Sequence, residues 1–189
     1  MPAPLPDSAV TRAPGWLRRR LSPKLLWLGL LTPTLFGFDW ASKKAIVETV
    51  GPREVVPVLG SWLSLVHAEN PGAGFSLPIP MAVLILAGFV GLGLLVRMVV
   101  RMPDAARLPA VAVSMLLAGG LGNQLDRLGD GTVTDFMRVS AVDSALGPWL
   151  IEQVGTATWP IFNVADVLLL VGVGMLVVMP RRWMESAPA

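Results

Sequence analysis

Four long apolar stretches constrain the fold of this chain more than any other feature. They cover residues 25–38, 79–96, 108–125 and 161–179, and Asp166 is the only charged residue inside them. A helix that crosses the hydrocarbon core of a bilayer needs about 20 residues, because each residue adds about 1.5 Å. The first stretch reaches that length if it continues through Asp39 and Lys43. The sequence therefore predicts four membrane-spanning helices, over about residues 24–44, 79–97, 107–127 and 160–180.

The composition agrees with a membrane protein and argues against several other classes. Only 15% of the 189 residues are charged and 53% are hydrophobic, whereas about 25% of an ordinary soluble domain is charged. Intrinsic disorder requires low hydrophobicity. The chain has no cysteine, which excludes disulfides, thiolate metal sites and cysteine nucleophiles. No dense basic tract is paired with aromatic residues, so we expect no nucleic-acid partner.

The first stretch also fits a cleaved signal peptide, because several cations precede its 14 uncharged residues. Cleavage requires small residues after the apolar run. In this chain the run is followed by Asp39-Trp40-Ala41, which begins with a carboxylate. We therefore interpret the stretch as a permanent span rather than as a signal peptide.

The distribution of charge predicts how the chain is oriented. With four spans, both termini and the loop 97–107 lie on the same side of the membrane. That side holds ten of the fifteen Lys and Arg residues and three of the thirteen acids, whereas the rest of the chain holds five cations and ten acids. Segments rich in Lys and Arg stay in the cytoplasm. We therefore expect cytoplasmic tails at 1–22 and 183–189 and a single membrane domain at 23–182.

Two segments remain on the outer side, at about 45–78 and 128–159. The first alternates apolar and polar residues and is broken by prolines and glycines, which favours short strands. The second contains an amphipathic pattern at 141–154, and Trp149 and Trp159 are suited to the membrane interface. The expected fold is a mainly α integral membrane protein with four transmembrane helices, a small β-rich cradle and a short outer helix.

A group of polar residues lies at the outer end of the predicted spans. Those in the first and last spans are four and three residues apart, so each pair lies on one helix face. Charges in or beside a span are costly and usually functional. We therefore expect one site near the outer membrane boundary. The residues of this group are Asp39, Lys43, Asn70, Asn123, Asp126, Arg127, Asp135, Asn163 and Asp166.

The acids of this group indicate carboxylate chemistry. Asp39, Asp126, Asp135 and Asp166 are expected to converge, and two neighbouring carboxylates in an apolar site share one proton. One then acts as a base on water while its protonated partner polarises a carbonyl group, as in an aspartic peptidase. These considerations do not choose which two acids form the pair. The single histidine, His67, provides no cluster for a zinc site.

Five short motifs resemble those of the bacterial lipoprotein signal peptidases (signal peptidase II), four-span aspartic peptidases of the membrane. They occur in the order found in that family and extend over residues 39–166, about two-thirds of the chain. The motifs are Asp39-Trp-Ala-Ser-Lys43, Asn70-Pro-Gly-Ala-Gly-Phe-Ser76, Gly122-Asn123-Gln-Leu-Asp126-Arg127, Gly131-Thr-Val-Thr-Asp135-Phe136 and Phe162-Asn163-Val-Ala-Asp166.

The resemblance implies that Asp135 and Asp166 form the catalytic dyad. It further implies structural motif roles for Gly122 and Asp126. Family members cleave prolipoproteins before a cysteine that carries diacylglycerol, so the expected partners are this substrate and membrane lipids. We expect a monomer in the bacterial inner membrane, with its site near the periplasmic face and without a metal or organic cofactor. The residues expected to bind substrate or brace the site are Asp39, Lys43, Asn70, Gly72, Asn123, Arg127 and Asn163.

The chain departs from the family pattern in a few places, and two other functions stay open. Ser42 and Gly74 replace the usual Thr and Ala, and neither change removes a group that the chemistry needs. Asp135 and Asp166 are 31 residues apart, which indicates an insertion at about 137–160 that caps the cleft. One alternative is a catalytically silent paralogue that binds lipidated peptides. The other is a proton-coupled transporter, although its acids would cluster at only one membrane face.

Overall fold

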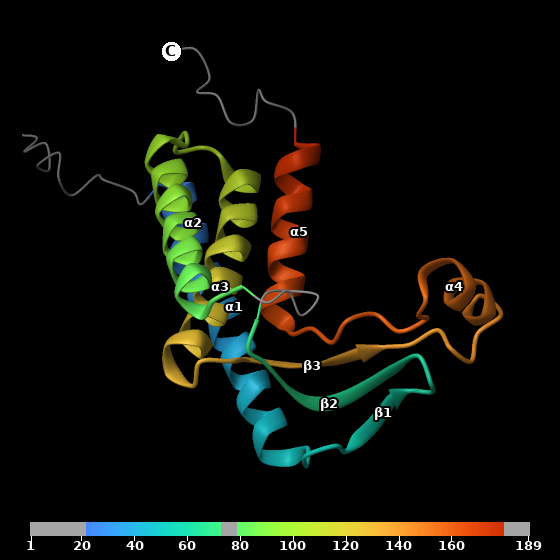
Figure 1. The fold of residues 1–189 in the computed structure, drawn as a ribbon. Coiled ribbons are helices and arrows are strands. Elements are labelled where there is room, and N and C mark those ends of the chain that lie inside the picture. The colour runs from blue at the N-terminus through green and yellow to red at the C-terminus, as the bar shows by residue number, and fades with distance from the viewer. Residues whose placement is uncertain (1–21, 73–78, 180–189) are drawn as a thin grey trace, which may run out of the picture.

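The computed structural model describes residues 22–72 and 79–179, and these form five helices and three strands (Figure 1). The predicted tails lie almost wholly outside this part of the chain, as do residues 73–76 of the second motif. In chain order the elements are α1 (Pro23–Thr49), β1 (Val55–Leu59), β2 (Leu63–Asn70), α2 (Met81–Arg101), α3 (Arg107–Gly129), β3 (Val133–Val139), α4 (Gly147–Val154) and α5 (Val164–Val178).

Helix α3 is the centre of the bundle and packs against α1, α2 and α5. Small residues allow this close packing, since Ala110, Ala112 and Ala118 are fully buried on α3. A Cβ atom at Gly119 would lie 2.5 Å from the carbonyl oxygen of Ala165, so the backbones of α3 and α5 approach too closely there for any side chain. Membrane helices commonly associate through such small residues.

The helices agree with a membrane protein in length and surface. Within the described residues, α2 and α3 are each long and apolar enough to cross a bilayer. No residue of α2 is buried, and its exposed side chains include Leu86, Phe89 and Leu94. Helix α5 is strongly apolar but shorter, with 15 residues, and α1 is longer, with 27. An apolar surface of this extent suits contact with lipid.

Helix α1 extends beyond its expected end at about residue 44, so residues 45–49 are helical rather than part of the strand-rich segment. The reason lies in packing, because Ile46 in the last turns and Val50 just after them are buried against Phe136 of β3. This apolar cluster stabilises the end of α1 and attaches the sheet to the bundle.

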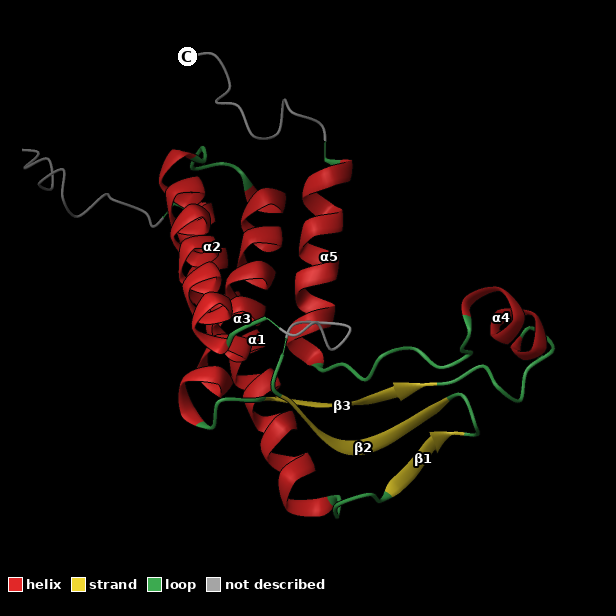
Figure 2. Cartoon of the chain, in the orientation of Figure 1, coloured by secondary structure: helices red, strands yellow, loops and turns green. Residues whose placement is uncertain are grey.

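The three strands form one antiparallel sheet in the order β1-β2-β3, at one end of the bundle (Figure 2). This agrees with the expectation of short strands after the first span. In the register of β2 and β3, Ala68 pairs with Asp135 and Asn70 pairs with Val133. The pairing therefore places the end of β2 beside the acid of β3.

The segment after β3 turns back toward α5 after a short helix. Helix α4 occupies Gly147–Val154 only, because the residues before it form turns, with the Gly147 amide donating to the Ser144 carbonyl. Figure 1 shows α4 at the far end of the sheet, away from the long helices. The chain then runs along β3, where the Phe162 carbonyl accepts from the amides of Phe136 and Met137. This return path brings Asn163 to the side of Asp135.

Candidate active site

Asp135 lies in the middle of β3 and is almost completely buried. Its Oδ2 accepts a hydrogen bond from Asn70 Nδ2 at 3.0 Å, and its Oδ1 accepts one from Asn163 Nδ2 at 2.8 Å. Burial raises the pKa of Asp135 to about 6, and the nearby Asp166 carboxylate also raises it. The bonds from Asn70 and Asn163 and the charge of Lys43 act in the opposite direction.

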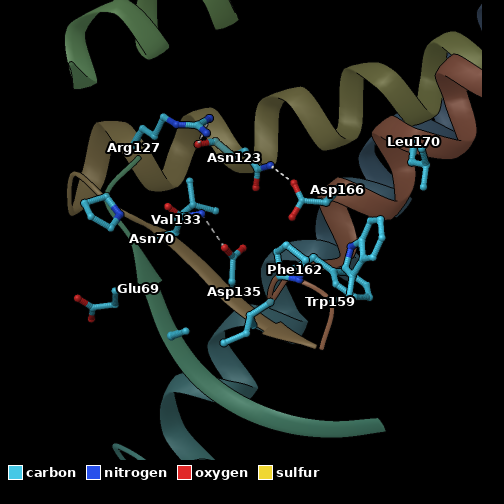
Figure 3. Close-up of a pocket in the computed structure, with 14 residues that line it drawn as sticks. Glu69, Asn70, Asn123, Arg127, Val133, Asp135, Trp159, Phe162, Asp166 and Leu170 are labelled. Carbon is cyan, nitrogen blue, oxygen red and sulfur yellow. Dashed lines mark hydrogen bonds between the residues drawn. The ribbon is translucent and has the colours of Figure 1, made fainter. Parts of the chain in front are cut away.

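Asp166 is held at the third position of α5 by a capping box. Its backbone amide donates to Asn163 Oδ1 at 3.0 Å, and its Oδ2 accepts from the Asn163 amide at 3.1 Å. The remaining oxygen, Oδ1, accepts from Asn123 Nδ2 at 2.9 Å (Figure 3). A capping box satisfies helix amides that otherwise have no partner. In this chain it also fixes the orientation of a carboxylate.

Asn163 connects the two acids. Its buried side chain caps α5 and donates to Asp135, while its backbone amide bonds to Asp166. It donates further to Asn123 Oδ1 at 3.1 Å and to the Thr134 carbonyl at 3.3 Å. Asn163 therefore caps α5 and also links the two acids, which agrees with the expectation that it braces the site.

Asn70 does not cap a helix, since it ends β2 and the N-cap of α2 is Pro80. Its Oδ1 accepts from the Gly72 amide at 3.0 Å, which forms a tight turn, and its amide nitrogen is left to bind Asp135. The turn therefore orients the Asn70 side chain toward β3. This is also where the structure places Gly72.

Two other acids of the group belong to a separate network around Lys43. The Lys43 Nζ atom lies 2.9 Å from Asp39 Oδ2 and 2.8 Å from Asp126 Oδ2, and it donates to Asn123 Oδ1 at 3.1 Å. Lys43 and Asp39 are both buried. Charges at such positions are tolerated only when they are paired and hydrogen-bonded. Asp39 and Asp126 therefore share one cation.

Asp39 also holds the first turn of α5. Its Oδ1 accepts from the Ala165 amide at 2.8 Å, one of the first helix amides that have no partner within the helix. Gly122 makes room for this contact, because a Cβ atom there would lie 2.3 Å from Asp39 Oδ2. The Lys43 network thus supports the turn that carries Asp166.

A cavity of about 530 Å³ opens beside the two acids of β3 and α5. Asp135, Asp166, Asn70, Asn123 and Arg127 line it, and its remaining wall is mostly apolar (Figure 3). Asp39, Lys43, Asp126 and Asn163 do not line it. The expectation that the segment 137–160 caps the cleft holds only for its end, because Trp159 and Pro160 reach the cavity and no residue of α4 does.

Sequence reasoning missed one residue that contacts this group. Gln124 on α3 accepts from Arg127 Nη1 through its Oε1, at 3.5 Å, and Arg127 Nη1 also donates to the Asn123 carbonyl at 3.3 Å. A glutamine inside an otherwise apolar stretch was the available signal. Among residues 22–72 and 79–179, no group of three or more His, Cys, Asp or Glu side chains is arranged to hold a metal ion.

Comparisons with known proteins find similar sequences over most of this chain. A family model described as signal peptidase (SPase) II matches residues 31–180. Lipoprotein signal peptidases of Chlorobium luteolum and Geobacter sulfurreducens are each 33% identical to it, over 147 and 155 residues. These alignments cover 76% and 79% of this chain and 84% and 89% of the two relatives.

A solved structure shares the fold. It is described as a bacterial membrane enzyme determined by the in meso method at 2.3 Å resolution. The TM-score is 0.68 at 26% sequence identity, and the alignment covers 80% of this chain and 85% of the other. The likeness therefore extends over the bundle and the sheet together.

Proposed function

The chain belongs to the signal peptidase II family of aspartic peptidases, and we propose that it removes the signal peptide from prolipoproteins, cleaving before a cysteine that carries diacylglycerol. Water is activated by Asp135 and Asp166. The relatives that resemble it over most of their length are lipoprotein signal peptidases, which supports the substrate class.

One observation carries the choice of the dyad. Of the four acids in the group, only Asp135 and Asp166 line the cavity, and both are held by Asn163. Among the described residues, the hydrogen-bond donors to Asp135 and Asp166 are amide groups, whereas Asp39 and Asp126 are paired with Lys43. A carboxylate bound by a lysine is a poor proton acceptor, so the cavity acids are the pair suited to share a proton.

In the proposed reaction the dyad holds one proton. The ionised carboxylate takes a proton from water as the water oxygen bonds to the scissile carbonyl carbon, and the protonated carboxyl donates a hydrogen bond to the carbonyl oxygen. The C–N bond then breaks, and the proton taken from water passes to the leaving amine. Asn70, Asn123 and Asn163 keep both carboxylates oriented, which reduces the entropy cost of reaching the transition state.

Cleavage of a purified diacylglyceryl prolipoprotein in detergent tests this function, with Asp135→Asn and Asp166→Asn as comparison. Release of the signal peptide by the wild-type protein supports a peptidase. Binding of the substrate without release would instead favour the silent paralogue. A transporter would neither bind nor cleave it.

The proposal includes an arrangement in the membrane. Helices α1, α2, α3 and α5 span the bacterial inner membrane as one domain of residues 23–182, the sheet and α4 lie at the periplasmic face, and both termini are cytoplasmic. The excess of cations in the terminal and 97–107 segments supports this orientation. A lipid-anchored substrate then reaches the cavity by lateral diffusion, and all site residues come from one monomer.

A reporter fused after Ala189 is expected in the cytoplasm, and a periplasmic reporter would contradict the orientation.

The pH dependence of kcat/KM is expected to report Asp135. Because the pKa of Asp135 is raised to about 6, the dyad loses its shared proton above that pH, and kcat/KM should decline there. Asn70→Ala removes a hydrogen bond that stabilises the ionised carboxylate, so the pKa rises and the decline moves to higher pH, by about one unit. The measurement is a pH–rate profile of both proteins. The control is Gln153→Ala, which removes an exposed amide on α4 and should leave the pH–rate profile unchanged. A decline that moves to lower pH in Asn70→Ala would contradict the assignment of this decline to Asp135.

A further inference from the structure

Gln124 is a polar side chain buried inside the helix bundle. It lies on α3 with 3% of its surface exposed, and its Nε2 donates to the Ile85 carbonyl oxygen of α2 at 2.8 Å. A polar side chain within a membrane helix is costly unless it finds a partner, and interhelical hydrogen bonds provide one. The bond therefore fixes the end of the Gln124 side chain against α2.

The backbone of α2 is shaped to accept this side chain. A Cβ atom at Gly88 would lie 2.3–2.5 Å from the three terminal atoms of Gln124. No alanine fits there while Gln124 keeps its position. Gly91, one turn further along α2, has no atom within 4 Å of the corresponding Cβ position. The close approach is thus specific to Gly88 and Gln124.

The other polar atom of the Gln124 amide group contacts Arg127. Its Oε1 accepts from Arg127 Nη1 at 3.5 Å, and the same nitrogen donates to the Asn123 carbonyl. Arg127 lines the cavity with Asp135 and Asp166. Its Nε is buried without a hydrogen-bond partner among the described residues. Gln124 is therefore placed between the Ile85 carbonyl of α2 and Arg127, the one cationic group among the described residues that line the cavity.

We propose that Gln124 is a positioning residue for Arg127, and that its bond to Ile85 transmits the position of α2 to the active site. The inference rests on the proposed peptidase function of the cavity. Negative charge develops on the carbonyl oxygen during peptide hydrolysis, and a preorganised cation opposes it best when its position is fixed. A displacement of about 1 Å at such a group costs up to about 100-fold in rate.

Substitution of Gln124 tests the role directly. Gln124→Met keeps the length of the side chain and removes both hydrogen bonds, so kcat is expected to fall about tenfold while KM changes less. Gln124→Glu keeps an oxygen acceptor for Arg127 but loses the donor to the Ile85 carbonyl, so its kcat is expected to lie between those of wild type and Gln124→Met. Rates are normalised to the folded, monodisperse fraction, because a merely structural role would lower that fraction and leave the kcat of the folded protein unchanged.

Glycine substitutions on α2 provide a matched control. Gly88→Ala should displace Gln124 and lower kcat in the same way as Gln124→Met, whereas Gly91→Ala should behave as wild type. In a Gln124→Ala background the space beside Gly88 is empty, so Gly88→Ala should cause no further loss. This non-additivity measures the coupling between the two positions.

Three results would overturn the inference. They are a kcat of Gln124→Met equal to wild type, a kcat of Gln124→Glu as low as that of Gln124→Met, and a Gly88→Ala effect that persists without the Gln124 side chain. Failure of the peptidase function is recognised separately, since the wild-type protein would then release no signal peptide from the prolipoprotein.

Discussion

Asp135→Asn and Asp166→Asn are each expected to reduce cleavage of a diacylglyceryl prolipoprotein by about 10⁴-fold or more. The reason is that the two carboxylates act as one unit, in which one takes a proton from water and the other donates to the carbonyl oxygen. When catalytic groups act together, removing one costs about as much as removing all of them. The double variant should therefore be no slower than either single variant, as measured by release of the signal peptide in detergent.

Asparagine has almost the size of aspartate, so both variants should fold. Asn163 still bonds to the neighbouring backbone in either of them. Asp143→Asn is a suitable control, because Asp143 is an exposed acid outside the lining of the cavity with the dyad. It should cleave at the wild-type rate. Substantial cleavage by either dyad variant, with the wild-type thermal transition, would refute the assignment of Asp135 and Asp166.

Lys43→Met is expected to have the largest effect on stability. The substitution removes the cation that pairs with buried Asp39 and partly buried Asp126, and it leaves Asn123 Oδ1 with one donor fewer. Breaking a buried ion pair by removing one partner costs about 3–5 kcal/mol, because the other charge remains without compensation. We expect a loss of this order in the free energy of unfolding, measured by denaturation in detergent micelles.

Lys44→Met provides the matched control, because Lys44 is the exposed neighbour of Lys43. A solvent-exposed charge contributes little to stability, so this variant should unfold as wild type does. Adding Asp39→Asn to Lys43→Met should recover part of the loss by removing the uncompensated carboxylate. Equal stability of Lys43→Met and Lys44→Met would show that the network around Lys43 does not support the fold.

The stability network and the catalytic acids are connected through the first turn of α5. Asp39 binds the Ala165 amide, and the next residue of that turn is Asp166. The expected cost of disturbing Lys43 therefore extends to the orientation of Asp166. Replacing a buried charge pair by well-packed apolar residues is often neutral or stabilising. The contact of Asp39 with the first turn of α5 gives a reason why this fold keeps the pair.

Local patterns in the sequence were sufficient to predict the long helices and the strands. Uninterrupted apolar stretches predicted the long helices, because hydropathy depends on each segment alone, and alternation with Pro and Gly predicted the strands. The predicted end of α1, at about residue 44, falls short of its end at Thr49. The reason is that Ile46 and Val50 are stabilised by contact with Phe136, which lies 90 and 86 residues further along the chain. Helix α4 is shorter than the amphipathic pattern at 141–154, because turns occupy the residues before it.

For the site, spacing showed which polar residues share a helix face but not which atoms meet. The 31 residues between Asp135 and Asp166 gave no indication that the chain returns along β3 and places Asn163 between the two acids. Gln124 was passed over, since its importance depends on Gly88 of another helix.

The four apolar stretches and the position of the charges were determined by the sequence alone, because hydropathy and charge are properties of single residues. They were enough to predict a helical membrane protein with its polar residues gathered near one face. Hydropathy and spacing did not separate the four acids, and the family resemblance implied the dyad without a physical reason; the tertiary structure shows how the environments of the acids differ. Lys43 pairs with Asp39 and Asp126, whereas Asp135 and Asp166 line the cavity and have amide partners. The chemistry of a carboxylate depends on its neighbours in space, and those neighbours come from distant parts of the chain.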